Sequence, residues 1–385
     1  MIGKDELTIG VEEEYLLIDP ESRDLVADPP AGLMDDCQAR ITGDIGNVAP
    51  ELLRAQLEVD TPVCTSIAEC REKVAALRRC ASEAARENGL RIMAASTHPF
   101  ADWTAQRHTD KERYNVLANE MQDVAQRLLI CGMHVHIGVP DNETRNDLLN
   151  QLGYFLPHLL ALSTSSPFWQ GRNTGLKSYR LTVFDDVPRS GLPSKFDSYG
   201  EYERHVAVLI RAGLIEDATK IWWDLRPSAR FPTLELRISD ICTRMDDGIT
   251  IAALYACIVS MLLRLRRNNQ RWRTYSNMLI QENRWRAQRY GFDEGMVDFG
   301  RGEIVPYADL LDEVIGLAAE DAERLDCVKE VEAARDILKR GTSAHRQTAI
   351  YDDAVAAGAD ETEALKAVVD WLVTETQVGV GASGG

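Results

Sequence analysis

Four short segments of this chain alternate polar and apolar residues in a way that strongly limits how they can fold. Side chains two residues apart on a β-strand point to the same side of a sheet, so each segment predicts a strand with one polar face. Seven of the polar positions are carboxylates or imidazoles, and none is lysine. They are Glu12 and Glu14, Glu58 and Asp60, His134 and His136, and Glu235. A solvated face is the ordinary explanation of such alternation, but this composition favours a functional face.

Carboxylates packed this densely on one face repel one another unless cations neutralise them. Oxygen ligands of this kind suit Mg²⁺, which often shares its coordination shell with substrate phosphates. The pair His134 and His136 is also compatible with zinc, but the surrounding carboxylates favour magnesium. A hydrogen-bonding role is equally open to either imidazole.

Arginines are concentrated in and beside the segment 163–232, which is rich in proline, glycine and aromatic residues. This composition predicts long, shaped loops around a site. Guanidinium groups hold carboxylates and phosphates in a fixed geometry, so the arginines indicate anionic substrates. Structural ion pairs are the alternative explanation. The arginines concerned include Arg172, Arg180, Arg226 and Arg237.

The order of the predicted elements indicates the fold class. Strands are expected at 7–18, 90–95, 133–139 and 233–239, and helices at 66–88, 147–162, 246–267, 321–338 and 361–374. A capping box of Ser66 and Glu69 begins the first helix, and Pro157 is expected to kink the second. Because no regular βαβ rhythm is present, we predict an α+β fold with a largely antiparallel sheet. No linker is evident, so we expect a single domain over residues 1–378, followed by a flexible glycine-rich tail at 379–385.

Charge and composition exclude several classes of partner. A net charge of −18 disfavours nucleic acid and anionic membranes. The eight cysteines lack metal-binding spacing, which indicates reduced and mostly buried thiols. No signal peptide is visible, and the most apolar run, 249–263, is too short to span a bilayer, so we predict a cytoplasmic protein. A homo-oligomer is compatible with these features. No GxxxxGK[ST] loop is present, which excludes a P-loop mechanism.

Several motifs resemble those of the glutamate–cysteine ligase type 2 family, the small carboxylate–amine ligases of bacteria. The longest are TIGVEEEYLLID at 8–19, GMHVHIGV at 132–139 and DLRPSARFPTLELR at 224–237. Shorter matches lie at 166–172, 283–291 and 368–373. Together they extend the resemblance over nearly the whole chain, from about residue 7 to 375.

The resemblance implies a fold like the catalytic domain of glutamine synthetase, in which an antiparallel sheet curves into a funnel with helices packed outside. It also implies ATP and Mg²⁺ as cofactors, with metal ligands corresponding to Glu12, Glu14, Glu51, Glu58, His134 and Glu235. Arg237 and Glu58 would be catalytic. Substrate or nucleotide would be bound by His136, Arg172, Arg180, Arg226 and Arg237.

The implied reaction is the ligation of a small carboxylate, with glutamate expected, to an amine such as cysteine. The γ-carboxylate is activated as an acyl phosphate, the amine attacks it, and ADP and phosphate are released. Two other functions remain open from the residues. One is a metal-dependent phosphohydrolase or phosphodiesterase that uses the same carboxylates. The other is a catalytically weak relative that binds nucleotide.

Overall fold

A seven-stranded antiparallel sheet forms the centre of the computed structural model, which describes residues 7–381. The strand order is β10-β11-β5-β1-β3-β2, and β4 pairs with one end of β1. The strands are β1 (Ile9–Ile18), β2 (Asn47–Pro50), β3 (Gln56–Asp60), β4 (Arg91–Met93), β5 (Met133–Gly138), β10 (Leu225–Pro227) and β11 (Thr233–Leu236). The predicted α+β class with a mainly antiparallel sheet is confirmed.

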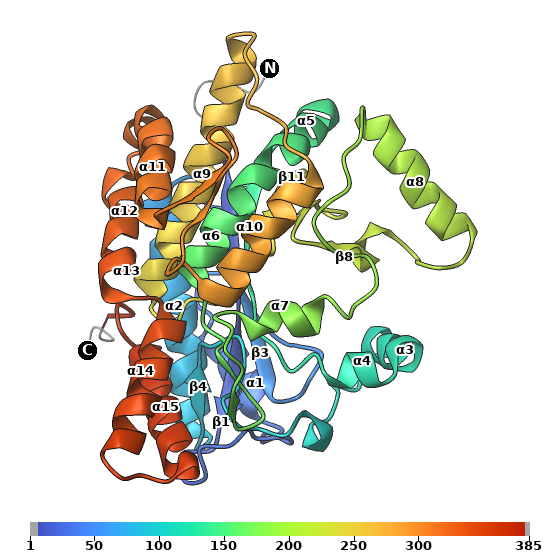
Figure 1. Ribbon diagram of the computed structural model, residues 1–385. Helices are drawn as coiled ribbons and strands as arrows, with labels where there is room; N and C mark the ends of the chain where they lie inside the picture. The colour runs from blue at the N-terminus through green and yellow to red at the C-terminus, as the bar shows by residue number, and fades with distance from the viewer. Residues whose placement is uncertain (1–6, 382–385) are drawn as a thin grey trace.

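Helices cover one face of the sheet. The helices α2 (Ile67–Glu87) and α9 (Met245–Arg267) pack directly against the strands. Further helices on this side are α11 (Tyr307–Arg324), α12 (Val328–Glu332), α13 (Ala334–Arg340), α14 (Ser343–Ala356) and α15 (Glu361–Glu375), of which α15 also packs against β4. In Figure 1 these helices form the left side of the molecule, and the sheet lies to their right. The opposite face of the sheet is therefore available for a site.

Shorter elements lie toward the other side. They include α3 (Glu112–Met121), α4 (Asp123–Gln126), α7 (Tyr179–Phe184) and α8 (Tyr199–Arg211), which stand on the right of Figure 1. The remaining helices are α1 (Leu33–Arg40), α5 (Asn142–Leu152), α6 (Leu156–Ser163) and α10 (Asn277–Tyr290), with short 3₁₀ turns η1 (Trp103–Ala105), η2 (Gly153–Phe155) and η3 (Ala218–Lys220). Two-residue strands and one small hairpin complete the fold: β6 (Phe168–Trp169), β7 (Arg172–Asn173), β8 (Ser190–Gly191), β9 (Trp222–Trp223), β12 (Met296–Asp298) and β13 (Glu303–Val305).

The helix α9 is the core helix of the molecule. Among the described helices it alone is long and apolar enough to span a membrane by length and composition, but 89% of its most apolar window is buried inside the protein. Its packing against α2, α11 and β5 accounts for its apolar sequence. All eight cysteines are unpaired, and seven of them are buried.

Two predicted helices differ from the structure. The predicted helix 147–162 is divided into α5 and α6 by the 3₁₀ turn η2, which begins at Gly153. Proline lacks an N–H and its ring clashes with the carbonyl four residues earlier, so Pro157 requires the chain to change its geometry at Gly153. The predicted helix 321–338 is wrong, because three helices occupy 307–340. The break after α11 includes Asp326, whose φ of 51° is incompatible with a continuous helix.

The start of α2 and the C-terminal segment both differ in part from the sequence prediction. Ser66 caps α2 by accepting a hydrogen bond from the Glu69 N–H at 3.1 Å, but the Glu69 carboxylate bonds the N–H of Thr65 instead of completing the predicted box. In the segment predicted as a flexible tail, Val380 is buried and its carbonyl accepts a hydrogen bond from Arg79 at 2.7 Å. The chain is therefore packed as far as Val380, and residues 382–385 of the predicted tail lie outside the described residues.

Candidate active site

A cavity of about 640 Å³ lies over the polar face of the central sheet. Acidic and imidazole side chains of β1, β3, β5 and β11 form its floor. Its walls come from the loop after β2, from α3 and the segment that follows α4, from α7, and from the segments in and around β9 and β10. Cavity-lining residues of the floor include Glu12, Glu14, Glu58, His134, His136 and Glu235.

The strand register explains why side chains so distant in sequence meet here. Residues directly opposite each other on antiparallel strands have neighbouring Cβ atoms, so each aligned pair shares one patch of the face. Because β1 lies between β3 and β5, it joins the acidic strand to the imidazole strand. The register places Glu12 opposite Asp60 and His134, Glu14 opposite Glu58, and His136 opposite Glu235.

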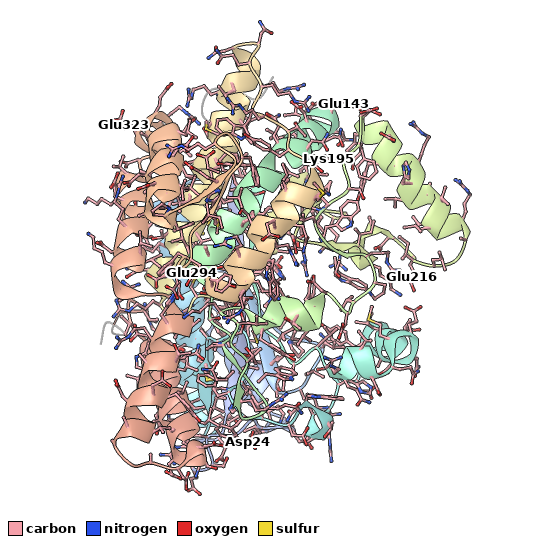
Figure 2. The ribbon with its side chains drawn as sticks, in the orientation of Figure 1. Asp24, Glu143, Lys195, Glu216, Glu294 and Glu323 are labelled. Carbon is pink, nitrogen blue, oxygen red and sulfur yellow. The ribbon has the colours of Figure 1, made fainter. Side chains whose placement is uncertain are left out.

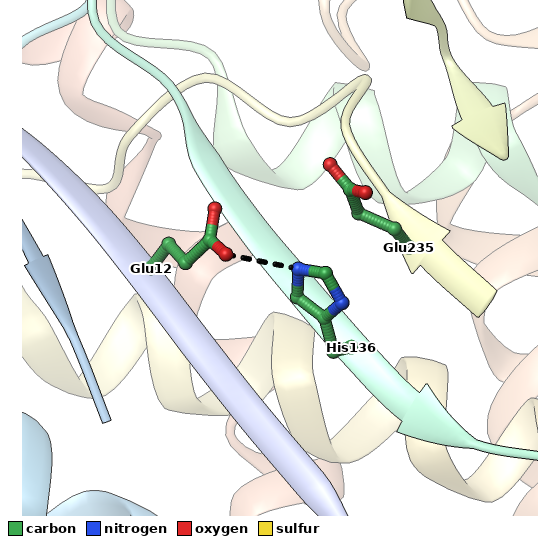
Figure 3. A group of neighbouring side chains, drawn as sticks. All are labelled: Glu12, His136 and Glu235. Carbon is green, nitrogen blue, oxygen red and sulfur yellow. Dashed lines mark ion pairs between the residues drawn. The ribbon is translucent and has the colours of Figure 1, made fainter. Parts of the chain in front are cut away.

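Glu12 lies between two imidazoles. Its Oε2 is 2.9 Å from Nδ1 of His134, and its Oε1 is 3.1 Å from Nε2 of His136. Burial raises the pKa of Glu12, but the hydrogen bond with His134 and the proximity of His136 lower it more, to well below its ordinary range. Figure 3 shows Glu12 beside His136, with Glu235 on the neighbouring strand. Metal-ligating atoms of Glu12, His136 and Glu235 all lie within 4.8 Å of one another, so these three side chains could hold one cation.

The pKa values of the two imidazoles are shifted in opposite directions. Burial and the nearby Arg237 lower the pKa of His134 to about 4, so His134 is neutral at pH 7. Burial lowers the pKa of His136, but Glu12 and Glu235 raise it more, and the net shift is upward. In both rings Nε2 is buried and has no hydrogen-bond partner within residues 7–381. The His136 Nε2 lies near Glu12, but without hydrogen-bond geometry. These buried nitrogens retain the capacity to bind a ligand.

The carboxylates on the β3 side of the floor repel one another. Glu14 accepts a hydrogen bond from the Gly132 N–H at 2.7 Å, yet burial and the charge of Glu51 raise its pKa to about 8. Burial and the charges of Glu51, Glu12 and Glu14 raise the pKa of Glu58 well above its ordinary range. A divalent cation would relieve this repulsion, because it supplies positive charge to hard oxygen ligands.

Arginines occupy the other side of the floor. Arg226 holds Glu235 through two hydrogen bonds, of 2.8 and 3.1 Å, and Arg237 pairs with the same carboxylate. Burial raises the pKa of Glu235, but Arg237 and Arg226 lower it more, and the net shift is downward. Arg226 also donates to the carbonyls of Thr219 and Ile221. It therefore fixes the loop before β9, in addition to its position in the cavity wall.

The structure brings together every predicted site residue except Arg172. Glu51 lines the cavity from the loop after β2, and Arg180 lines it from α7. Arg172 lies on the two-residue strand β7, is exposed, and is not among the lining residues of this cavity. The prediction that Arg172 binds substrate is therefore unsupported by its position.

The sequence analysis did not identify most of the residues that line the cavity walls. Lys220 is one such lining residue: its Nζ lies 2.8 Å from Glu120 of α3 and bonds Glu216, so it joins the two sides of the cavity. Figure 2 labels Glu216 on the side where α3 and α8 stand. Lys220 lies in the three-residue turn η3 and Glu216 in the loop before it, where no hydrophobic periodicity can form. Other missed lining residues are Tyr114, Leu117, Met121, Phe184, Trp222 and Phe231.

Comparisons with known proteins identify the family. The sequence matches the glutamate–cysteine ligase family 2 (GCS2) over residues 8–370. The chain belongs to this family. A relative from Rhodospirillum rubrum that bears the name "Putative glutamate–cysteine ligase 2" is 58% identical over 380 residues, which cover 98% of this ligase and 97% of the relative. A relative of the same name from a Jannaschia species is 52% identical over 97% of this chain and 98% of its own.

Solved structures share the fold at low sequence identity. A glutamate–cysteine ligase of Francisella tularensis, solved in complex with AMP, has a TM-score of 0.67 at 15% identity and covers 97% of this chain and 89% of its own. A bifunctional glutathione synthetase from Pasteurella multocida has a TM-score of 0.66 at 15% identity, over 97% of this chain and 53% of its own. The predicted ligase-type, glutamine synthetase-like fold is confirmed. Family membership also confirms the predicted enzyme class, an ATP-dependent ligase that forms a carbon–nitrogen bond.

Proposed function

We propose that this ligase uses Mg²⁺-bound ATP to join the γ-carboxylate of glutamate to an amine such as cysteine. The names of its relatives support glutamate and cysteine, and the AMP complex of a structural neighbour supports an adenine nucleotide. The observation that carries the proposal is the gathering of Glu12, Glu14 and Glu58 in one cavity, where mutual repulsion calls for cations. Eight unpaired cysteines suit a reducing compartment, and we place the enzyme in the cytoplasm.

Two groups of side chains fit Mg²⁺. One comprises Glu14, Glu51 and Glu58, whose repulsion is described above. The other comprises Glu12, His136 and Glu235, and His134 lies beside it with a buried, unpartnered Nε2. When bound, Mg²⁺ would neutralise phosphate charge and so favour transfer of the γ-phosphoryl group.

The reaction then needs positioning and no protein nucleophile. A carboxylate oxygen of glutamate forms a bond to the γ-phosphorus while the bond to the ADP oxygen breaks, which leaves an acyl phosphate and ADP. The amine nitrogen next bonds the carbonyl carbon, phosphate departs with its oxygen, and the nitrogen loses its surplus proton to solvent. Arg237 and Arg180 also line the cavity, where their guanidinium donors can stabilise the anionic groups that react.

The decisive experiment is to incubate the protein with Mg²⁺, ATP, glutamate and a panel of amines, and to weigh the products by mass spectrometry. A γ-glutamyl amide formed together with stoichiometric ADP supports the proposal. Release of phosphate that needs neither glutamate nor an amine would instead identify a phosphohydrolase. Binding of Mg²⁺-ATP without any product would identify a catalytically weak relative.

A further inference from the structure

Arg180 is a buried guanidinium with donor capacity to spare. Its side chain is 2% exposed and lines the cavity. Its Nη1 donates to the carbonyls of Arg237 and Ile238 at 3.2 and 3.4 Å, and its Nε has no hydrogen-bond partner in the described part of the chain. Within residues 7–381 no carboxylate forms an ion pair with it, whereas Arg226 and Arg237 both hold Glu235. Burying a charge without a bonded counter-charge costs folding free energy, which indicates a functional role for Arg180.

The backbone of Arg180 is firmly held. Its N–H donates to Oγ of Ser166 at 3.1 Å, and that hydroxyl donates to Oδ2 of Asp240 at 2.7 Å. The other carboxylate oxygen of Asp240 accepts a hydrogen bond from Ser178, which precedes α7. The start of α7 is thus fixed to Asp240, which follows β11 in the chain.

Gly132 decides where that side chain can lie. It forms an antiparallel bridge with Asp240 and precedes β5. A Cβ at this position would stand 2.5 Å from Nη2 of Arg180, 3.1 Å from its Cζ and 3.2 Å from Nε2 of His134. The guanidinium therefore occupies the space that a side chain would fill. The same residue donates its N–H to Glu14 at 2.7 Å, so Gly132 brings Arg180 and Glu14 to one point of the floor.

We propose that Gly132 is a positioning residue: its missing side chain lets the Arg180 guanidinium lie beside Glu14, where it binds the carboxylate of the substrate that is to be phosphorylated. This inference rests on the proposed function. It assigns the γ-carboxylate of glutamate to the space between Arg180 and the proposed Mg²⁺ site that includes Glu14. A guanidinium fork suits that role, because it presents parallel N–H donors to the two carboxylate oxygens.

The test is the substitution Gly132→Ala, with Gly10→Ala as matched control. A Cβ at Gly10 would meet its nearest atoms at 3.8 and 3.9 Å, which is ordinary contact on the neighbouring strand. In Gly132→Ala the Glu14 hydrogen bond survives and the crowded atoms are the ends of two side chains, Arg180 and His134, so the melting temperature should stay near that of the control. The Kd for glutamate should rise about 10- to 100-fold, the range expected for loss of a charged hydrogen-bonding partner.

Calorimetry of glutamate binding, in the presence of Mg²⁺ and a non-hydrolysable ATP analogue, gives this Kd without requiring turnover. The variants Arg180→Lys and Gly132→Ala/Arg180→Lys complete a double-mutant cycle. If Gly132 acts through Arg180, the double variant binds glutamate no more weakly than Arg180→Lys alone, and the affinity for the nucleotide analogue matches the control throughout. Additive losses, or a Gly132→Ala enzyme that binds glutamate like Gly10→Ala, would overturn the inference. Failure of the wild type to form an amide while it binds glutamate would refute only the proposed function.

Discussion

Three consecutive glutamates on β1 face two different environments, and the contrast between them separates structure from function. Glu13 points to the helix-covered face and is 1% exposed. Arg78 of α2 binds it with two hydrogen bonds, of 2.8 and 3.0 Å, and the Tyr15 hydroxyl donates to the same carboxylate. The protein thus supplies a complete counter-charge for Glu13.

Glu12 and Glu14 point to the cavity face, where two imidazoles contact Glu12 but no salt bridge within residues 7–381 neutralises Glu14. Burial and the charge of Glu51 raise the pKa of Glu14, and burial and the neighbouring carboxylates raise the pKa of Glu58, opposite Glu14, well above its ordinary range. Glu13 and Glu14 are adjacent and chemically identical, but of the two only Glu13 forms an ion pair with an arginine. A buried carboxylate that the fold neutralises is structural, and one that the fold leaves to repel its neighbours is a candidate ligand.

The largest change in stability should come from breaking the buried ion pair of Glu13 and Arg78. Glu13→Gln leaves Arg78 buried without its carboxylate, and removal of one partner of a buried ion pair costs about 3–5 kcal/mol of folding free energy. Urea denaturation measures this loss, and the activity per folded molecule should be retained. The surface pair of Lys366 and Glu363 provides the control, since Glu363→Gln should change stability by at most about 1 kcal/mol. Equal losses in the two variants would remove the distinction between the faces.

The cavity face should give the opposite pattern. Glu58→Gln and Glu12→Gln remove proposed metal ligands, so turnover should fall by about 10²- to 10³-fold or more, as for loss of a key electrostatic group. Stability of the metal-free Glu58→Gln protein should be equal or higher, because glutamine replaces a buried carboxyl group whose ionisation is unfavourable. Initial rates of amide formation and melting temperatures test both halves. Near-normal turnover in either variant would show that the metal assignment is wrong.

This contrast also explains what could be predicted from the sequence. Because side chains alternate with a period of two, the sequence alone places Glu12 and Glu14 on one face and Glu13 on the other. It does not identify Arg78 as the partner of Glu13, since that pairing depends on how α2 packs across the sheet. Register is likewise a tertiary property, so the alignment of Glu14 with Glu58 appears only in the structure.

The cavity walls were beyond sequence reasoning for a different reason. Lys220 and Trp222 lie in and beside two- and three-residue elements, where no periodic pattern can form. Arg172 illustrates the converse situation: a motif match locates a segment but not the direction of its side chains, and Arg172 lies outside the cavity lining. The predicted helix 321–338 failed at Asp326, where a single left-handed residue ends the helical geometry.

A smaller effect should link pH to magnesium on the cavity face. The pKa of Glu14 is raised from its ordinary 4.5 to about 8, so the folded metal-free protein binds this proton more tightly than the unfolded chain does. Its contribution to stability is therefore complete below pH 4.5 and is lost as the pH rises toward 8. Bound Mg²⁺ should offset that loss, so Mg²⁺ should raise the melting temperature more at pH 8 than at pH 6. In Glu14→Gln this difference between the two pH values should shrink, and an unchanged difference would assign it to other groups.

The smallest effect should come from Arg172, the predicted site residue that the structure leaves outside the cavity. Arg172→Ala removes an exposed side chain on β7, so the KM for glutamate and the rate of amide formation should stay close to the wild-type values. Arg180→Ala, which removes a guanidinium from the cavity, is its matched opposite and should raise the KM for glutamate strongly. The two arginines occur in the same arginine-rich stretch of sequence, so only their position relative to the floor distinguishes them. A comparable rise in KM for both variants would mean that residue type, and not placement on the unneutralised face, governs which charges act on substrate.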